Sequence, residues 1–400
     1  LFNYGTVEVE IISPENLGFP FPALLAFYST GDEKSVVHTA GRILNSNEDQ
    51  RNYLWKETNF LSRLNKDFSP FIFLFFAKTQ KKTANLKINF YNCIKNTKIL
   101  SKKIKIVTES FGSKCIYIDQ YLNLGEKKKL NNKDFFISFE IKIEGVFGRF
   151  VVGNLHKKTK HHFTTHSFQH IDKHNKDFVK PLDEKPISTF LPIFNKKPLQ
   201  VIAKSYPTNS ESLINLDVYK SSLSKKMIKT KNKINFKTGG KNASILQYYL
   251  KDDESIKLTS SGNVPSRLNV NYNFFLKNSI HPTDIATSFK ANVYPDKMNH
   301  WGSSILEKDW VTIIFLRNLN HRNNSKKDKI KFEAFNELAN LKKNIFIDSE
   351  SVKIIKLKYS DFKKKSKFFS WKINSYKSSL EVFWVSYNLK TGAICGEHSF

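Results

Sequence analysis

Histidines recur at related positions of this chain and could bind a metal ion. His38, His166 and His398 lie at matching points of three similar segments, and His166 and His398 both stand in a His-Ser-Phe tripeptide. Zinc needs three or four ligands that converge in space, and imidazole is a common one. We therefore predict His38, His166 and His398 as metal ligands. Two alternatives stay open: a local site in the His-rich stretch His156–His174, and histidines that only bond to backbone groups at strand ends.

Tryptophan, arginine and asparagine side chains near the expected strands form a second candidate site. Sugar-binding surfaces on β-sandwiches combine an aromatic face with polar side chains that bond to hydroxyl groups. The tryptophans could instead fill a joint between domains. The candidate ligand-binding residues are Trp301, Asp309, Trp310, Arg317, Asn318, Arg149 and Trp384.

Paired carboxylates or an activated nucleophile would indicate an enzyme. Glu140, Glu144 and Asp134 lie near one expected strand, and Glu381 and Glu397 lie near the last ones. Glycoside hydrolysis needs two carboxylates across a cleft, and these positions do not recur between the similar segments. The chain has no G-x-S-x-G sequence, no Gly-rich phosphate loop and no motif that indicates a cofactor. We expect no catalytic residue, and a metal- or carboxylate-dependent enzyme of saccharide metabolism is the alternative.

The elements that must position these residues are arranged as three similar segments. The segments end in HHFTTHSF at His161–Phe168, PTDIATSF at Pro282–Phe289 and AICGEHSF at Ala393–Phe400. Upstream of each ending, runs with alternating apolar residues follow in the same order and are rich in β-branched and aromatic side chains. This pattern predicts an all-β fold of tandem antiparallel β-sandwich domains with about seven strands each.

The expected strands precede the common ending in each copy. In the first copy they are Ser69–Lys78, Ala84–Asn92, Lys102–Glu109, Lys114–Leu122, Phe135–Ile143 and Phe147–Asn154. In the second copy they are Ser188–Lys197, Ser212–Lys220, Asn232–Thr238, Ala243–Leu250, Ser255–Ser260 and Ser266–Asn273. In the third copy they are Asp309–Asn318, Asp328–Asn336, Lys343–Ser349, Val352–Tyr359, Phe368–Asn374 and Leu380–Asn388. The stretch Phe335–Lys343 also predicts a short helical turn.

The spacing of the copies predicts the domain organisation. We expect β-sandwich repeats at residues 46–170, 171–290 and 291–400, preceded at 1–45 by the C-terminal part of a truncated fourth repeat. Within that part, Val7–Ile12, Ala23–Ser29 and Ser35–Arg42 resemble the last three runs of a copy, and the chain begins with Leu. We therefore predict a fragment of a longer repeat protein. The copies are expected to pack against one another, and an oligomer is compatible with such packing.

The formal net charge of +29 predicts weak, salt-dependent attraction to polyanions. It does not predict sequence-specific binding of nucleic acid. Specific readers rely on the bidentate contacts of Arg, and only seven of the 65 basic residues are Arg. The chain also lacks RRM, zinc-finger and helix-turn-helix patterns. Lysines on solvated strand edges, where they block aggregation, explain the charge more simply.

The cysteines and the hydropathy of the chain indicate in which cellular environment it could fold. Cys93, Cys115 and Cys395 have no regular spacing, so we predict buried free thiols instead of a disulfide framework. The lack of a disulfide pattern favours a cytoplasmic location. No stretch approaches the roughly 20 apolar residues of a membrane helix, and the apolar run Phe71–Ala77 is expected to be a buried strand.

The order of strands in Trp310–Phe400 is similar to that of a known family. An apolar strand ends in Arg317–Asn318, a polar loop follows, and a second strand ends in Phe335–Asn336. A paired third and fourth strand then precede FFSWKINSYKSSLEVFWVSYN at Phe368–Asn388. This order resembles the small β-sandwich of the sensory-rhodopsin transducer-like family. The resemblance implies a soluble, non-enzymatic, multimeric protein that binds carbohydrate or a partner. Members of that family have a single domain, unlike this tandem chain, and no functional residue is carried over.

Together these features predict a non-enzymatic binding or scaffolding protein built of tandem β-sandwich repeats. Its expected ligand is a carbohydrate or a protein partner.

Overall fold

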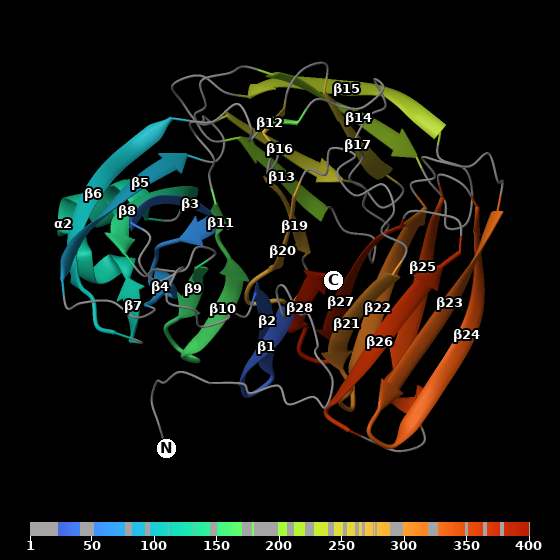
Figure 1. Ribbon diagram of the computed structural model, residues 1–400. Helices are drawn as coiled ribbons and strands as arrows, with labels where there is room; N and C mark the ends of the chain where they lie inside the picture. Colours follow the sequence, from blue (N-terminus) through green and yellow to red (C-terminus); the bar gives the residue numbers. More distant parts are fainter. Residues whose placement is uncertain are drawn as a thin grey trace. The chain divides into compact units, whose positions relative to one another are not determined.

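β-Strands make up nearly all of the regular structure in the computed structural model (Figure 1). The strands form several small antiparallel sheets that are grouped in pairs, so the all-β prediction is confirmed. The chain divides into unit 1, Leu1–Thr30 with Val36–His170, and unit 2, Gly31–Ser35 with Ile171–Phe400. The residues that the structure describes are 23–40, 52–76, 82–92, 97–110, 112–131, 133–144, 150–169, 178–179, 199–205, 212–220, 228–238, 244–250, 254–260, 264–265, 269–274, 276, 278–288, 299–318, 327–348, 351–362, 366–376 and 380–399.

Unit 1 contains a four-stranded and a five-stranded sheet. The first has the order β10-β9-β4-β7, with β4 (Phe68–Phe75), β7 (Ser113–Tyr117), β9 (Val151–His156) and β10 (His161–His166). The second has the order β11-β3-β8-β5-β6, with β3 (Asn52–Arg63), β5 (Thr83–Asn92), β6 (Lys98–Val107), β8 (Asp134–Glu144) and β11 (Phe168–Gln169).

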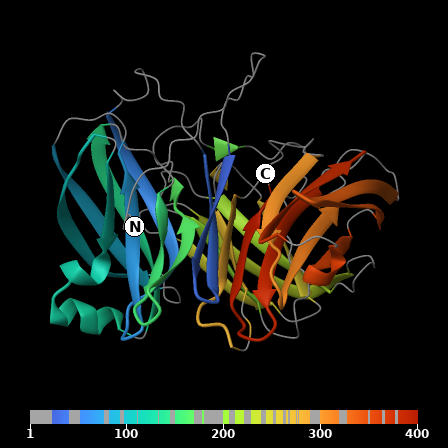
Figure 2. The same ribbon diagram turned by 90° about the horizontal axis from the view of Figure 1, so that it is seen from below.

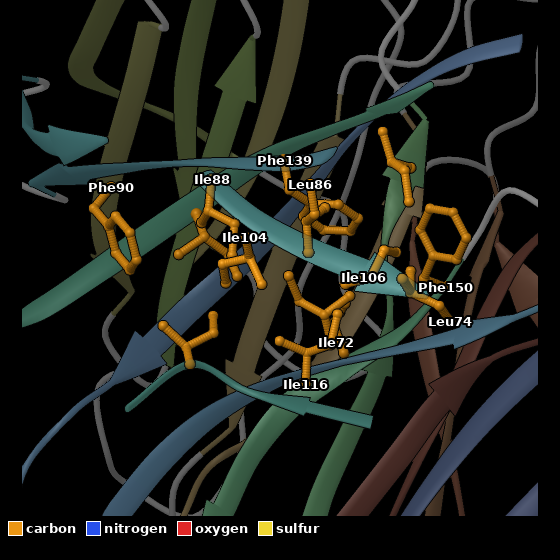
Figure 3. Packing of buried hydrophobic residues seen from close by; sticks show 14 of the residues in the cluster. Ile72, Leu74, Leu86, Ile88, Phe90, Ile104, Ile106, Ile116, Phe139 and Phe150 are labelled. Atoms are coloured by element: carbon orange, nitrogen blue, oxygen red, sulfur yellow. The ribbon is translucent and has the colours of Figure 1, made fainter. Parts of the chain in front are cut away.

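The core of unit 1 lies between these two sheets. Ile72 and Leu74 come from β4, Leu86 and Ile88 from β5, and Phe139 from β8, and all five side chains are fully buried. Figure 3 shows side chains from both sheets pointing into this one cluster. Alternate residues of a strand point to opposite sides, so the alternating runs in the sequence produce one apolar side per sheet. The two sheets therefore pack as a sandwich.

Unit 1 also contains most of a β-hairpin and a short helix. The hairpin joins β1 (Ala23–Thr30) to β2 (Glu33–Ala40), and Gly31 in its turn has a φ of 59°. Its Ala26 and Val37 pack with Phe71 on the side of β4 that faces away from the core. Figure 2 shows the helix α2 (Leu124–Leu130) at one end of the unit, after the 3-10 turn η1 (Ile118–Tyr121).

Unit 2 begins with a group of sheets for which mainly the backbone is described. One sheet has the order β16-β13-β19-β20, with β13 (Leu199–Ser205), β16 (Ser244–Leu250), β19 (Asn269–Phe274) and β20 (Thr283–Ser288). A second has the order β15-β14-β17, with β14 (Ser212–Lys220), β15 (Ile228–Thr238) and β17 (Glu254–Ser260). The short strands β12 (Phe178–Val179) and β18 (Val264–Pro265) also pair.

Two four-stranded sheets form the C-terminal part of unit 2. One sheet has the order β21-β26-β23-β24, with β21 (Asn299–Ile305), β23 (Lys327–Asn336), β24 (Ala339–Asp348) and β26 (Phe368–Ser375). The other has the order β25-β22-β27-β28, with β22 (Trp310–Asn318), β25 (Val352–Lys358), β27 (Leu380–Asn388) and β28 (Ile394–His398). The 3-10 turn η4 (Tyr359–Asp361) follows β25. The buried sides include Trp371 and Trp384, both without exposed surface.

Most predicted strands coincide with observed ones, and one prediction is contradicted by the structure. Ser212–Lys220 and Leu380–Asn388 match β14 and β27 at both ends. The predicted run Ser188–Lys197 lies outside the described residues, and the strand that precedes β14 is β13. The helical turn predicted at Phe335–Lys343 is wrong, because this stretch is the β23–β24 hairpin. There the Asn336 side chain accepts a hydrogen bond from the backbone N–H of Leu338 at 2.9 Å.

Within the part of the chain that the structure describes, no helix has the length and apolar character needed to span a bilayer.

Candidate functional site

Most of the predicted ligand-binding residues are inside the protein. Trp310, Arg317, Asn318 and Trp384 are buried, with at most 4% of their surface exposed. Asp309 is half-buried, and its carboxylate lies 2.7 Å from the Lys390 ammonium. Arg149 lies outside the described residues. Trp301 is 41% exposed and is the one described member of the predicted set with a large exposed side chain.

The burial of Trp310, Arg317 and Asn318 follows from the position of β22. This strand lies between β25 and β27, and all nine of its residues are buried. Phe315 on one of its sides packs against Phe274, with ring centroids 6.0 Å apart. The segment WVTIIFLRN shows no polar–apolar alternation, which is typical of a strand covered on both sides. That missing alternation was the sequence signal for burial.

Trp301 is exposed because its neighbours on β21 point inward. His300 is buried and its Nδ1 lies 2.6 Å from the Ser399 hydroxyl. Gly302 is opposite Trp371 on β26, and a Cβ atom at Gly302 would collide with the Trp371 indole. The Trp371 indole N–H donates to the Ser304 hydroxyl at 3.0 Å. These inward contacts fix the register of β21, so Trp301 points to the other side of the sheet.

A row of polar side chains extends from Trp301 across the sheet. Trp301 is opposite Lys372 on β26, Lys372 is opposite Glu333 on β23, and Glu333 is opposite Lys342 on β24. The Glu333 carboxylate lies 2.9 Å from the Lys372 ammonium and 3.3 Å from the Lys342 ammonium. It also accepts a hydrogen bond from the Asn340 amide at 2.7 Å. The Asn340 hydrogen bond and then the two lysines lower the pKa of Glu333 to about 2.

Rows on either side of this one carry amides, hydroxyls and aromatic rings. Towards one end the residues that face each other are Ser303, Ser370, Phe335 and Asn340, and towards the other they are Asn299, Asn374, Lys331 and Asn344. Phe335, Phe346, Phe368 and Tyr376 are each at least 38% exposed. We call this exposed side of β21, β26, β23 and β24, with Tyr376, the Trp301 face. It combines flat apolar rings with groups that donate and accept hydrogen bonds.

The matching sheet of unit 1 presents no comparable exposed surface among its described side chains. Lys87 and Glu140 form an ion pair there at 3.5 Å. The aromatic pair beside it, Tyr91 and Phe136, is stacked with ring centroids 4.7 Å apart but is at most 9% exposed.

The predicted metal ligands fall into both units. In unit 1, the rings of His38 and His166 are in contact, with centroids 4.2 Å apart and planes at 73°. The Nδ1 atom of His166 is 2.9 Å from the Ser167 carbonyl, so a proton on Nδ1 leaves Nε2 as the atom with a lone pair. His398 belongs to unit 2, where its Nδ1 is 2.8 Å from the Ser399 carbonyl and its Nε2 is 3.8 Å from the Glu397 carboxylate.

Other histidines of unit 1 make local contacts. His162 Nε2 is 3.0 Å from the Tyr117 hydroxyl, and burial lowers the pKa of His162. His156 Nδ1 is 2.8 Å from the Thr159 hydroxyl, and burial also lowers the pKa of His156. The His162 contact joins β10 to β7, and the His156 contact lies at the turn between β9 and β10.

Three of the candidate carboxylates, Glu381, Glu397 and Glu140, are directed to different sides or engaged elsewhere. Glu381 is opposite Arg317, whereas Glu397 is opposite Trp384 on β27. Because positions 381 and 384 are three apart on one strand, the two carboxylates are directed to opposite sides of the sheet. Glu140 is engaged with Lys87. The side chains of Asp134 and Glu144 lie outside the described part of the chain.

Cys115 and Cys395 are free thiols, as predicted, and Cys395 is buried whereas Cys115 is half-buried. Burial raises the pKa of Cys115 to about 11 and raises that of Cys395 further. Both thiols therefore stay protonated at neutral pH and are poor nucleophiles. Cys93 lies outside the described residues.

No known family model matches the chain, and no curated protein matches it.

Proposed function

We propose that this chain is a non-enzymatic carbohydrate-binding protein built of tandem β-sandwich copies, and that the Trp301 face holds the ligand. The observation that carries the proposal is the exposed Trp301 ring, 41% exposed, in one row with Lys372, Glu333 and Lys342. A sugar ring has an apolar side of C–H groups and a rim of hydroxyls. The first fits an indole plane, and the second fits amides, carboxylates and ammonium groups.

The chemistry of the face favours a sugar over a protein core. Its polar groups are held in place: Glu333 is bonded to three neighbours, and Asn299, Asn374 and Asn344 lie in the adjacent row. Fixed polar groups among separate aromatic rings suit a ligand rich in hydroxyls. The cores of protein interfaces, in contrast, are depleted in charged residues. A protein partner is therefore the second choice for this face.

The order of strands supports the proposed tandem copies at 46–170, 171–290 and 291–400. Three four-stranded sheets have the orders β7-β4-β9-β10, β16-β13-β19-β20 and β25-β22-β27-β28. Counted from β4 and from β22, these are the first, fourth, sixth and seventh strands, and the middle copy follows the same order with the short strand β18 added before β19. The companion sheets share the order β6-β5-β8, β15-β14-β17 and β24-β23-β26. The resemblance to the transducer-like family stays a prediction.

The His-Ser-Phe endings support the same equivalence. The backbone N–H of Ser167 donates to the Phe150 carbonyl at 2.7 Å, and that of Ser399 donates to the Val382 carbonyl at 2.9 Å. The preceding histidines also bond alike, each through Nδ1 to the carbonyl of the following serine, at 2.9 and 2.8 Å. Similar tripeptides in the same local geometry are expected of copies of one domain.

A glycan array followed by calorimetry tests the proposal. We expect the full chain to bind a subset of glycans, and Trp301→Ala to weaken that binding about 10-fold or more, because a central aromatic ring often dominates binding energy. Trp301→Phe should retain part of the affinity. Leu389→Ala is the matched control, because Leu389 is a 61% exposed apolar residue outside the Trp301 face. No bound glycan, or equal binding by Trp301→Ala and the wild type, would contradict the proposal. A Trp301-dependent protein partner in place of a glycan would do so too.

The His38–His166 contact favours a second candidate function, the binding of a transition-metal ion in unit 1. Two buried imidazoles in contact can supply two of the four ligands that zinc prefers. Titration of the full chain with Zn²⁺ should show one site that His38→Ala and His166→Ala each weaken, and that His162→Ala, the control, leaves intact. Equal Zn²⁺ affinity in all four proteins would rule this site out.

A further inference from the structure

The Trp301 face carries more positive than negative groups. Lys327, Lys329 and Lys331 are alternate, exposed residues of β23, so their side chains leave the same side of the strand about 7 Å apart. Lys342 and Lys372 flank them on β24 and β26. The described carboxylates on this side are Glu333 and Asp348, which lies opposite Lys327. Five lysines therefore face two carboxylates.

Aromatic rings hold two of these lysines in fixed positions. The Lys331 ammonium lies 5.4 Å from the centre of the Tyr376 ring, and the Lys327 ammonium lies 5.2 Å from the centre of the Phe346 ring. A hydrogen bond to Tyr376 raises the pKa of Lys331. Ammonium groups fixed over rings lose less conformational freedom on binding an anion than freely rotating lysines lose.

Lys372 and Lys342 are already partly neutralised. They share the Glu333 carboxylate at 2.9 and 3.3 Å, and its pKa of about 2 keeps it charged at all physiological pH values. Most of the excess positive charge therefore belongs to the lysine row of β23, where three lysines face Asp348 alone among the remaining described carboxylates of this side. This row lies two strands from Trp301, roughly 10 Å across the sheet from the spacing of neighbouring strands. One oligosaccharide can span that distance.

We infer that the ligand of the Trp301 face is an acidic carbohydrate, with a sugar ring on Trp301 and its carboxylate or sulfate groups on Lys329 and Lys331. The inference rests on the proposed carbohydrate-binding function and adds the charge class of the ligand. We infer an anionic sugar because the positive charge of the lysine row is complementary to negative groups on the ligand.

The test compares one sugar backbone in two charge states. Oligogalacturonide and its fully methyl-esterified form are titrated into the full chain at about 50 mM and about 200 mM NaCl, because screening over a Debye length of about 10 Å near 0.1 M weakens ionic contacts. Four proteins are compared: wild type, Trp301→Ala, the double variant Lys329→Gln/Lys331→Gln, and the control Lys356→Gln/Lys358→Gln. The control lysines are exposed residues of β25, outside the face.

The expected affinities distinguish the contribution of the lysine charges from that of stacking on Trp301. The wild type and the control should bind the acid form about 10-fold more tightly than the ester at low salt, and less so at high salt. The Lys329→Gln/Lys331→Gln variant should bind both forms as the wild type binds the ester. Trp301→Ala should weaken both forms.

Three results would overturn the inference in distinguishable ways. If both forms bind equally and need Trp301, the charge class is wrong but carbohydrate binding stands. If neither form binds and a glycan array is also empty, the proposed function fails together with the inference. If the acid form binds without Trp301 and a single-stranded oligonucleotide binds equally well, the lysines attract polyanions in general, and an acidic sugar is not the specific ligand.

Discussion

At the scale of single residues, the candidate site depends on which aromatic and charged side chains reach the surface. The sequence identified Trp301 by residue type, but it did not distinguish Trp301 from the buried Trp310 and Trp384. The sequence did not identify Lys372 and Glu333, because their position beside Trp301 depends on how three strands far apart in sequence are aligned. The alternating lysines of β23 were the available signal, since alternation marks an exposed side, but alternation does not identify the neighbouring strand.

Glu333 should make the stability of unit 2 depend on pH. Its pKa is lowered from 4.5 to about 2, by Asn340 and by the two lysines, so its contribution is present above pH 4.5 and is lost as the pH falls towards 2. Melting temperatures of the wild type and Glu333→Gln, measured at pH 6 and at pH 2.5, should differ more at pH 6. The glutamine variant serves as the reference for all other groups that titrate. An equal difference at both pH values would show that the ion pairs contribute nothing.

At the scale of elements, the sequence predicted most strands correctly, but it did not predict the short helix and it gave a helical turn where a hairpin lies. Runs rich in apolar and β-branched residues located β14 and β27 to the residue. The helix α2 was missed, although Asn123 and Glu126 form a capping box with two hydrogen bonds of 2.9 Å, a pattern that can be read from the sequence. At Phe335–Lys343 the good helix formers suggested a turn of helix, and pairing with β23 outweighed that local preference.

Gly302→Ala should destabilise the edge of the β21-β26-β23-β24 sheet. The new methyl group would collide with the buried Trp371 indole, which bonds to Ser304 and has little room to move. Overpacking of this kind typically costs about 1–3 kcal/mol. Denaturant unfolding followed by tryptophan fluorescence measures the loss. Asn299→Ala, an exposed position of the same strand on the other side of the sheet, is the control and should change stability by less than about 0.5 kcal/mol. Equal stability of Gly302→Ala and the wild type would refute the packing described for β21.

At the scale of the whole molecule, unit 1 and unit 2 each have buried cores of their own. The positions of the strands could be predicted, because they follow from local runs of apolar and β-branched residues. The pairing between strands far apart in sequence, such as β4 with β9, could not, because it depends on the closed core and not on local pattern.

A substitution in the core of unit 1 should destabilise unit 1 more than unit 2. Ile88 is fully buried in the core of unit 1, so Ile88→Ala should cost about 2–5 kcal/mol, and Ile88→Val about 0.5–1.5 kcal/mol. Hydrogen exchange read peptide by peptide should show faster exchange in β4, β5 and β8 of the variant. Peptides from β22 and β27 should be the least affected. Uniform acceleration along the whole chain would contradict separate cores.

The central claim is that the Trp301 face binds carbohydrate, and hydrogen exchange of the full chain with a glycan selected on the array tests it most directly. We expect the bound glycan to slow exchange in peptides covering β21, β23, β24 and β26, and this protection to disappear in Trp301→Ala. Protection confined to any other strands, or protection that persists in Trp301→Ala, would contradict the claim.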